Sequence, residues 1–293
     1  MEEDISHEIL HFVDRMRWST LLKSPAWLGG RHESLRKGRS PEFKEYREHR
    51  LGEDASLVDW KGSAKGGRRL VRECDHQGLL NHWLILDDSA SMSFPDGEFE
   101  KFRRQQILCG LLLYWIQSIG DCSSVLRKSG GMTKASSPSR GQAALRQKIA
   151  QIALGRTGSR FHFDDLRYEL RAHLKQPSVI WMMTDFDRSP EECIELGGRW
   201  REEGHEVHLL HLYHPTERDL GMLGLTVFED LEGRWAERST DVAEIKEGFM
   251  EEMESHLQKI QYLGRAAQVR IHSVNVCLSP EAWMAKVLSP VAN

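Results

Sequence analysis

The sequence predicts an α/β fold with a doubly wound, mainly parallel sheet and a small β-rich N-terminal element. Short apolar runs at Trp83–Asp87, 179–183 and 205–213 are typical of strands that are buried on both faces. Longer segments with helical periodicity separate these runs, and strands that alternate with helices favour parallel pairing. The chain should therefore form one open sheet with helices on both faces.

The first 80 residues are expected to form a region of their own. Apolar side chains at helical spacing over residues 3–18 predict an amphipathic helix that covers the protein's own core or binds a partner. A linker-like stretch rich in Gly and Pro follows at 19–40. Short apolar runs between glycine turns then indicate a β-rich element at 40–75. We divide the chain into residues 1–80 and 81–293.

The second region continues the alternation of strands and helices. The helical segments share an apolar face at 3.6-residue spacing and cover 98–118, 142–154, 164–174, 190–203, 242–263 and 281–288. Further strands are expected at 123–128 and 267–276. A hairpin or loop is expected at 130–141, and an edge strand with a turn at 225–235.

The composition excludes several classes of protein. At 293 residues with a net charge of −4, the chain has no general attraction for nucleic acid or anionic membranes. Its apolar runs are all shorter than the ~20 residues that a membrane-spanning helix needs. The N-terminus lacks a signal-peptide layout, and the five scattered cysteines indicate free thiols in a reducing compartment. We expect a cytoplasmic protein.

Charge is uneven along the chain. Residues 31–72 carry 12 Lys/Arg against 7 Asp/Glu, and residues 229–254 carry 10 Asp/Glu against 3 Lys/Arg. The basic side chains of the first stretch either bind phosphate or an acidic protein, or pair with neighbouring carboxylates and brace the turns. The acidic helix in the second stretch is either an interaction surface or a solvated face.

The strongest chemical signal follows the first buried strand. Asp87, Ser89 and Ser91 are spaced two apart in a polar loop, and open α/β sheets bind ligands at the carboxyl ends of their strands. One carboxylate and two hydroxyls suit a hard cation such as Mg²⁺, which prefers oxygen ligands. The alternative is a helix N-cap, because Asp and Ser are common caps after strands.

Two other polar loops strengthen the metal hypothesis. A second buried strand ends at Thr184 and Asp185, and a loop rich in Gly and hydroxyls at 155–165 offers Thr157 or Ser159. A turn or a helix cap is the alternative for this loop as well. Since the carboxyl ends of parallel strands meet at one edge of a sheet, these oxygens should converge there.

This constellation resembles the von Willebrand factor type A fold, and the DxSxS at 87–91 looks like that family's metal-ion-dependent adhesion site. The resemblance implies that Ser89, Ser91 and Thr157 bind Mg²⁺ directly, with Mn²⁺ or Ca²⁺ as alternatives. It implies that Asp87 and Asp185 act largely through water. The sixth position would stay open for an acidic side chain of a partner.

Residues 40–92 narrow the resemblance to the bacterial family known as domain of unknown function 58. Relatives are often paired with MoxR-type AAA+ ATPases, which implies an adaptor or co-chaperone that acts on client proteins. The chain departs from the family pattern where Gly155-Arg156-Thr157-Gly158 replaces Gly-Gly-Thr-Asp and where Glu53 replaces an aspartate. It also lacks the membrane helices that precede this region in some relatives.

Three other functions compete with a Mg²⁺-dependent binding module. Asp87 and Asp88 could hold a metal and activate water for hydrolysis. However, the chain lacks the DxDx(T/V), G-x-S-x-G and Walker A patterns, and no plausible general base is placed in the metal loops, although Asp88 and His162 are nearby in sequence. Nucleic-acid binding through the basic stretch at 31–72 is disfavoured by its mixed charge. A zinc site at histidines 205–214 is disfavoured because alternate positions of a strand face opposite sides.

Overall fold

The computed structural model describes residues 2–16, 37–48, 63, 70–77, 79–95, 97–129, 132–158, 163–186, 190–221, 225–228 and 238–289. The chain divides into two compact units. The larger comprises Met1–Trp27 and Asn81–Asn293, and the smaller comprises Leu28–Leu80.

The smaller unit is built on an antiparallel pair of strands. β1 (Lys37–Glu48) pairs with β2 (Leu70–Gln77), as expected for a β-rich element. The register shifts between Lys37 and Glu42, a span that contains Pro41, which has no N–H to donate to the ladder. The predicted glycine turns, Glu53 and most of the residues proposed to brace the turns lie outside the described residues.

The larger unit contains a six-stranded sheet, and the predicted α/β fold with a mainly parallel sheet is confirmed. All neighbouring strands run parallel except the pair formed by β4 and β5. In spatial order the strands are β10 (Arg270–Asn275), β7 (Glu206–Tyr213), β6 (Ser178–Thr184), β3 (Asn81–Leu86), β4 (Cys122–Ser129) and β5 (Met132–Ala135). The three central strands are buried along almost their whole length. This burial explains the apolar runs in their sequences, although β7 also buries Glu206, His208 and His211.

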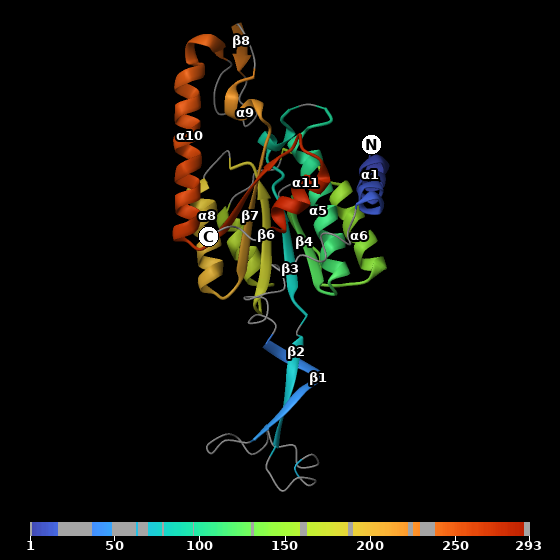
Figure 1. Ribbon diagram of the computed structural model, residues 1–293. Helices are drawn as coiled ribbons and strands as arrows, with labels where there is room; N and C mark the ends of the chain where they lie inside the picture. The colour runs from blue at the N-terminus through green and yellow to red at the C-terminus, as the bar shows by residue number, and fades with distance from the viewer. Residues whose placement is uncertain are drawn as a thin grey trace. The chain divides into compact units, whose positions relative to one another are not determined.

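Helices cover both faces of this sheet (Figure 1). One face packs against α5 (Lys101–Ser118), which is flanked by α6 (Gln142–Ala153) and α11 (Pro280–Val287). Side chains of the other face form a core with α7 (Phe163–Arg171), α8 (Pro190–Glu202) and α10 (Val242–Ala266). The result is a three-layer α/β/α arrangement.

The N-terminal helix belongs to the sheet-containing unit, which differs from the predicted division at residue 80. Helix α1 (Glu2–Arg15) packs against α5 and α6. Ile9 is fully buried there and lies so close to Gly110 that a Cβ on this glycine would be 2.4 Å from its side chain. The helix therefore covers the protein's own core, which is one of the two roles that the sequence left open.

Buried aromatic and histidine rings cross the face that α5 covers. Trp181 donates to Nδ1 of His82 over 3.1 Å and stacks on His208 at 4.0 Å between ring centroids. His208 in turn lies 3.0 Å from His272 on the edge strand. His211 lies on the opposite face and packs against Phe186. This separation agrees with the argument against a zinc site.

Three short elements depart from the sequence expectations. β8 (Leu225–Phe228) is not an edge strand of the main sheet, because it pairs with β9 (Arg238–Asp241) in a separate two-stranded sheet. Helix α9 (Thr216–Asp219) and the 3₁₀ turn η2 (Ala90–Ser93) are too short to produce a periodic pattern. Both border the candidate site described below.

Cys109, Cys122, Cys193 and Cys277, the cysteines whose side chains the structure describes, are free thiols, as expected. No helix within the described ranges is long and apolar enough to cross a bilayer.

Candidate metal centre

The carboxyl ends of β3 and β6 bring the two predicted aspartates together. These strands are parallel neighbours with Leu86 paired to Met183. The ladder continues one residue further, where the N–H of Asp87 donates to the carbonyl of Met183 over 3.1 Å. Asp87 and Asp185 therefore leave the sheet at the same edge, as the sequence predicts for parallel strands.

Both carboxylate oxygens of Asp87 accept hydrogen bonds from the protein. Oδ1 accepts from the N–H of Ser89 over 2.9 Å, and Oδ2 accepts from the hydroxyl of Thr184 over 2.7 Å. The first bond turns the loop back over the strand end, and the second ties that loop to the neighbouring strand. These two bonds fix the Asp87 carboxylate in place, and each of its oxygens can accept a further hydrogen bond.

The hydroxyls of the DxSxS loop lie side by side. Ser89 Oγ is 3.1 Å from Ser91 Oγ, and both residues are buried. Ser89 occupies the N-cap position of the 3₁₀ turn η2, but its side chain makes no capping hydrogen bond. Helix α5 begins only at Lys101 and uses neither serine as its cap. The structure therefore disfavours the capping alternative for this loop.

The third loop follows helix α6 and contacts the DxSxS loop through its backbone. The N–H of Gly158 donates to the carbonyl of Asp88 over 2.9 Å, which places the adjacent Thr157 beside that loop. Gly158 has a φ of +102°, a conformation that a residue with a side chain rarely adopts. The alternative ligand Ser159 and His162 lie outside the described residues.

Arg127 holds the third loop and the DxSxS loop together. Its guanidinium, on β4, lies 3.0 Å from Oδ2 of Asp88 and donates to the carbonyl of Ile152 near the end of α6 over 3.1 Å. A Cβ at Gly155 would lie 1.9 Å from this guanidinium. The glycine at the start of the loop is therefore needed because the arginine passes against its backbone.

Gln105, on helix α5, also fixes the backbone of the DxSxS loop. The side-chain amide of Gln105 donates to the carbonyl of Asp87 over 2.9 Å and accepts from its N–H over 3.3 Å. The amide thus completes the backbone pairing at the point where β3 ends.

The site concentrates buried negative charge. Burial, and then the nearby charge of Asp185, raise the pKa of Asp87 to about 6. Burial raises the pKa of Asp88 to about 7, although its pairing with Arg127 acts in the opposite direction. A cation at this edge of the sheet would relieve the repulsion between Asp87 and Asp185.

Lys101, the first residue of α5, was not among the predicted site residues. Its ammonium is buried and donates to Oδ2 of Asp185 over 2.8 Å and to Oε1 of Glu217 over 2.5 Å. Burial alone would lower the pKa of Lys101, but the two carboxylates outweigh it and raise the pKa above its ordinary value. Glu217, on α9, also accepts from the N–H of His214 over 2.6 Å.

One signal in the sequence pointed to this lysine. A cation at the N-terminus of a helix opposes the helix dipole, so Lys101 needs a compensating contact elsewhere. Lys101 and Gln105 are also one helical turn apart and so share a face of α5. Neither observation identifies Asp185 or Glu217 as the partner.

The donor set of this edge consists of hydroxyls and carboxylates: Ser89, Ser91, Thr157, Asp87 and Asp185. Oxygen donors of this kind fit Mg²⁺ or a similar hard cation. Within the described ranges, no group of three or more His, Cys, Asp or Glu side chains is placed to hold a metal ion. A site here would therefore depend on the serine and threonine hydroxyls in addition to two carboxylates.

Comparison with protein families shows to which family the chain belongs. The family described as "Protein of unknown function DUF58" matches residues 45–259, which is most of the sequence. The chain belongs to the DUF58 family. The match spans the DxSxS loop, the third loop and the end of β6, together with Lys101 and Glu217. The family expected from residues 40–92 is thus confirmed.

Solved structures similar to this DUF58 chain share little sequence with it. BatB from Bacteroides thetaiotaomicron is 15% identical with a TM-score of 0.44, covering 70% of this chain and 94% of that protein. An aerotolerance-related membrane protein from Bacteroides fragilis is 13% identical with a TM-score of 0.45, covering 71% and 96%. The SpRpn10 VWA domain is 11% identical with a TM-score of 0.44, covering 73% and 99%. Comparison with curated proteins gave no match.

Proposed function

We propose that this DUF58 protein is a Mg²⁺-dependent protein-interaction module. The observation that supports the proposal is the meeting of three polar loops at one edge of the sheet. Asp87 lies next to the end of β6, Ser89 lies against Ser91, and Gly158 is bonded to Asp88. Loops far apart in sequence thereby supply oxygen donors to one place.

In this proposal Ser89, Ser91 and Thr157 bind the cation directly, and Asp87 and Asp185 hold it largely through water. Mg²⁺ keeps several waters and is bound by few protein ligands. One position then remains for a carboxylate of the partner, so an Asp or Glu side chain completes the coordination. Mn²⁺ or Ca²⁺ would serve in place of Mg²⁺.

We infer that the site binds without catalysing a reaction. The polar residues around the loops are engaged in fixed pairs: Asp88 with Arg127, Lys101 with Asp185 and Glu217, and Gln105 with the backbone of Asp87. Such pairs hold the loops rigidly, which lowers the cost of binding a ligand. No bond needs to be broken for a cation to recruit a carboxylate.

The resemblance described above supports a partner of the MoxR-type AAA+ ATPase class. We propose that the protein acts as an adaptor or co-chaperone that presents client proteins to this ATPase. A metal-dependent contact would suit this role. One carboxylate of the partner would complete the coordination of the cation, and the rest of the interface would determine which partner binds.

Ser89→Ala should abolish Mg²⁺-dependent binding of the partner ATPase. The variant removes a proposed ligand, and we expect the affinity measured with the purified ATPase by biolayer interferometry to fall about tenfold or more, or about 1.4 kcal/mol. EDTA should lower the affinity of the wild-type protein for the ATPase to the same level.

Ser93→Ala is the matched control, since Ser93 lies in the same turn and its hydroxyl donates to the carbonyl of Ala90 over 2.7 Å. This control should retain Mg²⁺-dependent binding. If Ser89→Ala binds the ATPase as tightly as the wild type does in Mg²⁺, the proposed site is wrong.

A further inference from the structure

The ammonium of Lys101 lies between two carboxylates that come from different elements. It donates to Oδ2 of Asp185, which follows β6, over 2.8 Å and to Oε1 of Glu217, on α9, over 2.5 Å. Asp185 belongs to the proposed Mg²⁺ site, whereas Glu217 lies outside the three loops that form it. One buried cation thus connects the proposed site to helix α9.

Glu217 is held in place by its own turn. Its Oε2 accepts from the N–H of His214 over 2.6 Å, and its N–H donates to the carbonyl of His214 over 3.0 Å. The ring nitrogen Nδ1 of His214 lies 2.7 Å from the hydroxyl of Thr216. The carboxylate of Glu217 is therefore fixed by contacts that do not involve Lys101.

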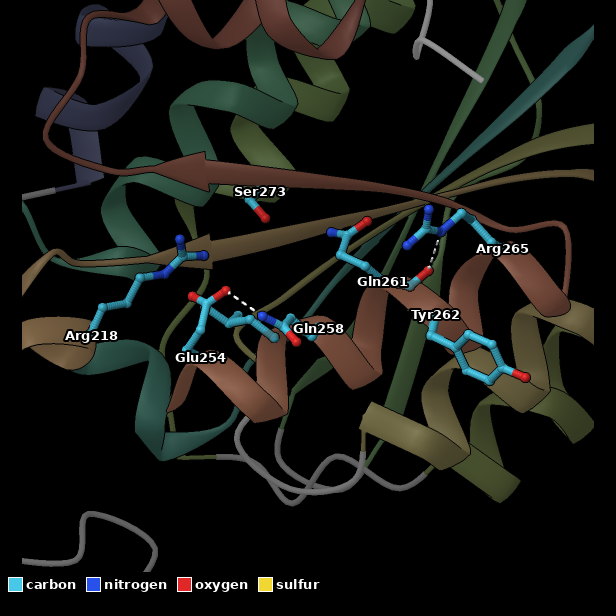
Figure 2. A pocket seen from close by; sticks show the side chains of 8 residues that line it. Arg218, Glu254, Gln258, Gln261, Tyr262, Arg265 and Ser273 are labelled. Atoms are coloured by element: carbon cyan, nitrogen blue, oxygen red, sulfur yellow. Dashed lines mark hydrogen bonds between the residues drawn. The ribbon is translucent and has the colours of Figure 1, made fainter. Parts of the chain in front are cut away.

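Helix α9 is also anchored on its other side, as Figure 2 shows. Arg218 follows Glu217 and lines a groove together with Glu254 of α10 and Ser273 of β10. The guanidinium carbon of Arg218 lies 3.3 Å from the centroid of the Tyr213 ring, so the planar group stacks on that ring. Helix α9 thus contacts Lys101 on one side and α10 on the other, which makes Glu217 a rigidly placed acceptor.

A cation held by Asp87 and Asp185 would compete with Lys101 for Asp185. The side chain of Lys101 is only 2% exposed, so water cannot replace a lost partner, and a buried charge without a partner is costly. A second positive charge at Asp185 would also repel the ammonium. Glu217 removes both difficulties, because its carboxylate already contacts Lys101 and balances the ammonium when Asp185 no longer does.

We propose that Glu217 is a positioning residue of the Mg²⁺ site, which retains Lys101 when Asp185 turns to the cation and thereby sets the affinity for Mg²⁺. This inference rests on the proposed function. It gives α9 a role in metal binding, although α9 contributes no ligand.

The test is isothermal titration calorimetry of Mg²⁺ into the full wild-type chain and into Glu217→Gln. The glutamine removes the charge but keeps an oxygen that accepts from the N–H of His214. Of its two carboxylate contacts Lys101 then keeps Asp185 alone, and it competes more strongly with the cation. We expect Glu217→Gln to bind Mg²⁺ about tenfold more weakly than the wild type, or weaker still.

Asp219→Asn is the matched control, because Asp219 is an exposed acidic residue of the same short helix. This substitution removes the same charge from α9 and leaves both contacts of Lys101 unchanged. The variant should bind Mg²⁺ like the wild type.

Repeating Glu217→Gln in the Lys101→Met background separates the proposed role from a direct one. Without the ammonium Glu217 has nothing to retain, so the substitution should no longer change the affinity for Mg²⁺. A carboxylate that only anchors α9, or that attracts the cation through space, would keep its effect in this background. Circular dichroism checks that each variant is folded, and if Lys101→Met is not, the comparison of Glu217→Gln with Asp219→Asn decides alone.

Failure of this inference and failure of the proposed function give different results. If the wild type binds Mg²⁺ and Glu217→Gln binds it no more weakly than Asp219→Asn does, Glu217 has no such role and the Mg²⁺ site stands. An effect of Glu217→Gln that persists in Lys101→Met overturns the inference in the same way. Absence of Mg²⁺ binding to the wild-type chain contradicts the proposed function, and the inference falls with it.

Discussion

Replacing Lys101 with Met should destabilise the protein strongly in EDTA and make its stability dependent on Mg²⁺. Lys101 and Asp185 are both almost completely buried, and their charged groups are 2.8 Å apart. Removing one member of a buried ion pair typically costs about 3–5 kcal/mol, because the remaining charge has lost its partner. In this protein the remaining Asp185 carboxylate also repels Asp87.

Mg²⁺ should restore much of this loss, since a cation between Asp87 and Asp185 replaces the missing ammonium. A ligand at about 100 times its dissociation constant stabilises the folded state by about 2.7 kcal/mol, and the gain should be larger for Lys101→Met than for the wild type. Urea unfolding with EDTA and with Mg²⁺ measures both effects.

Lys148→Met is the matched control for the loss of a buried lysine. Lys148 bonds to the hydroxyl of Ser123 and to the carbonyl of Ser139, over 3.1 Å and 2.8 Å, and faces none of the three loops. Its loss should destabilise the protein without creating a dependence on Mg²⁺. Equal stabilisation of both variants and the wild type by Mg²⁺ would show that Lys101 and the metal do not share a carboxylate.

Replacing Arg127 with Met should also cost about 3–5 kcal/mol, for a similar reason. Asp88 is fully buried, and Arg127 is its partner at 3.0 Å. The same guanidinium holds the carbonyls of Gln151 and Ile152 at the end of α6. The variant therefore leaves a buried carboxylate and also loosens the loop that carries Thr157.

The cost of Arg127→Met should increase with pH. Burial raises the pKa of Asp88 from 3.8 to about 7, so the folded protein binds this proton more tightly than the unfolded chain does. Stability contributed by Asp88 is therefore lost as the pH rises from about 4 towards 7. Arg127 counteracts this loss, and without it the pKa should rise further. The variant should lose more free energy of unfolding at pH 8 than at pH 5.

A second substitution identifies the group responsible. Asp88→Asn in the Arg127→Met background removes the buried charge and should recover most of the stability at pH 8. Arg146→Met, at an exposed position of α6, should change stability little at either pH. A penalty that is the same at pH 5 and pH 8, or that persists in the double variant, would contradict the role assigned to Asp88.

The sequence predicted the sheet and the position of its polar edge because both depend on local patterns. Strands that are buried on both faces have continuous apolar runs in their sequences, and Asp87 and Asp185 follow two such runs. Parallel pairing then places both aspartates at one edge. The pairing of β8 with β9 was missed because a strand of four residues does not reveal its partner.

The residues that hold the site together could not be predicted in the same way. Lys101 meets Asp185 and Glu217 across 84 and 116 positions of the chain, and no local pattern specifies such a contact. Gly155 is explained only by the guanidinium of Arg127 lying against its backbone. Lys101 also violates a local rule, since it places a positive charge at a helix N-terminus. Such conflicts are expected where function or long-range pairing overrides local preference.

The central claim is that three loops bind one divalent cation, and a Mg²⁺ titration followed by isothermal titration calorimetry tests it most directly. The account predicts a single saturable event for the wild-type chain, which Ser91→Ala and Thr157→Ala each weaken by about tenfold or more. These residues belong to different loops, so a shared loss means that both loops contribute to the same ion. No saturable binding to the wild-type chain, or wild-type affinity in Thr157→Ala, would contradict the claim.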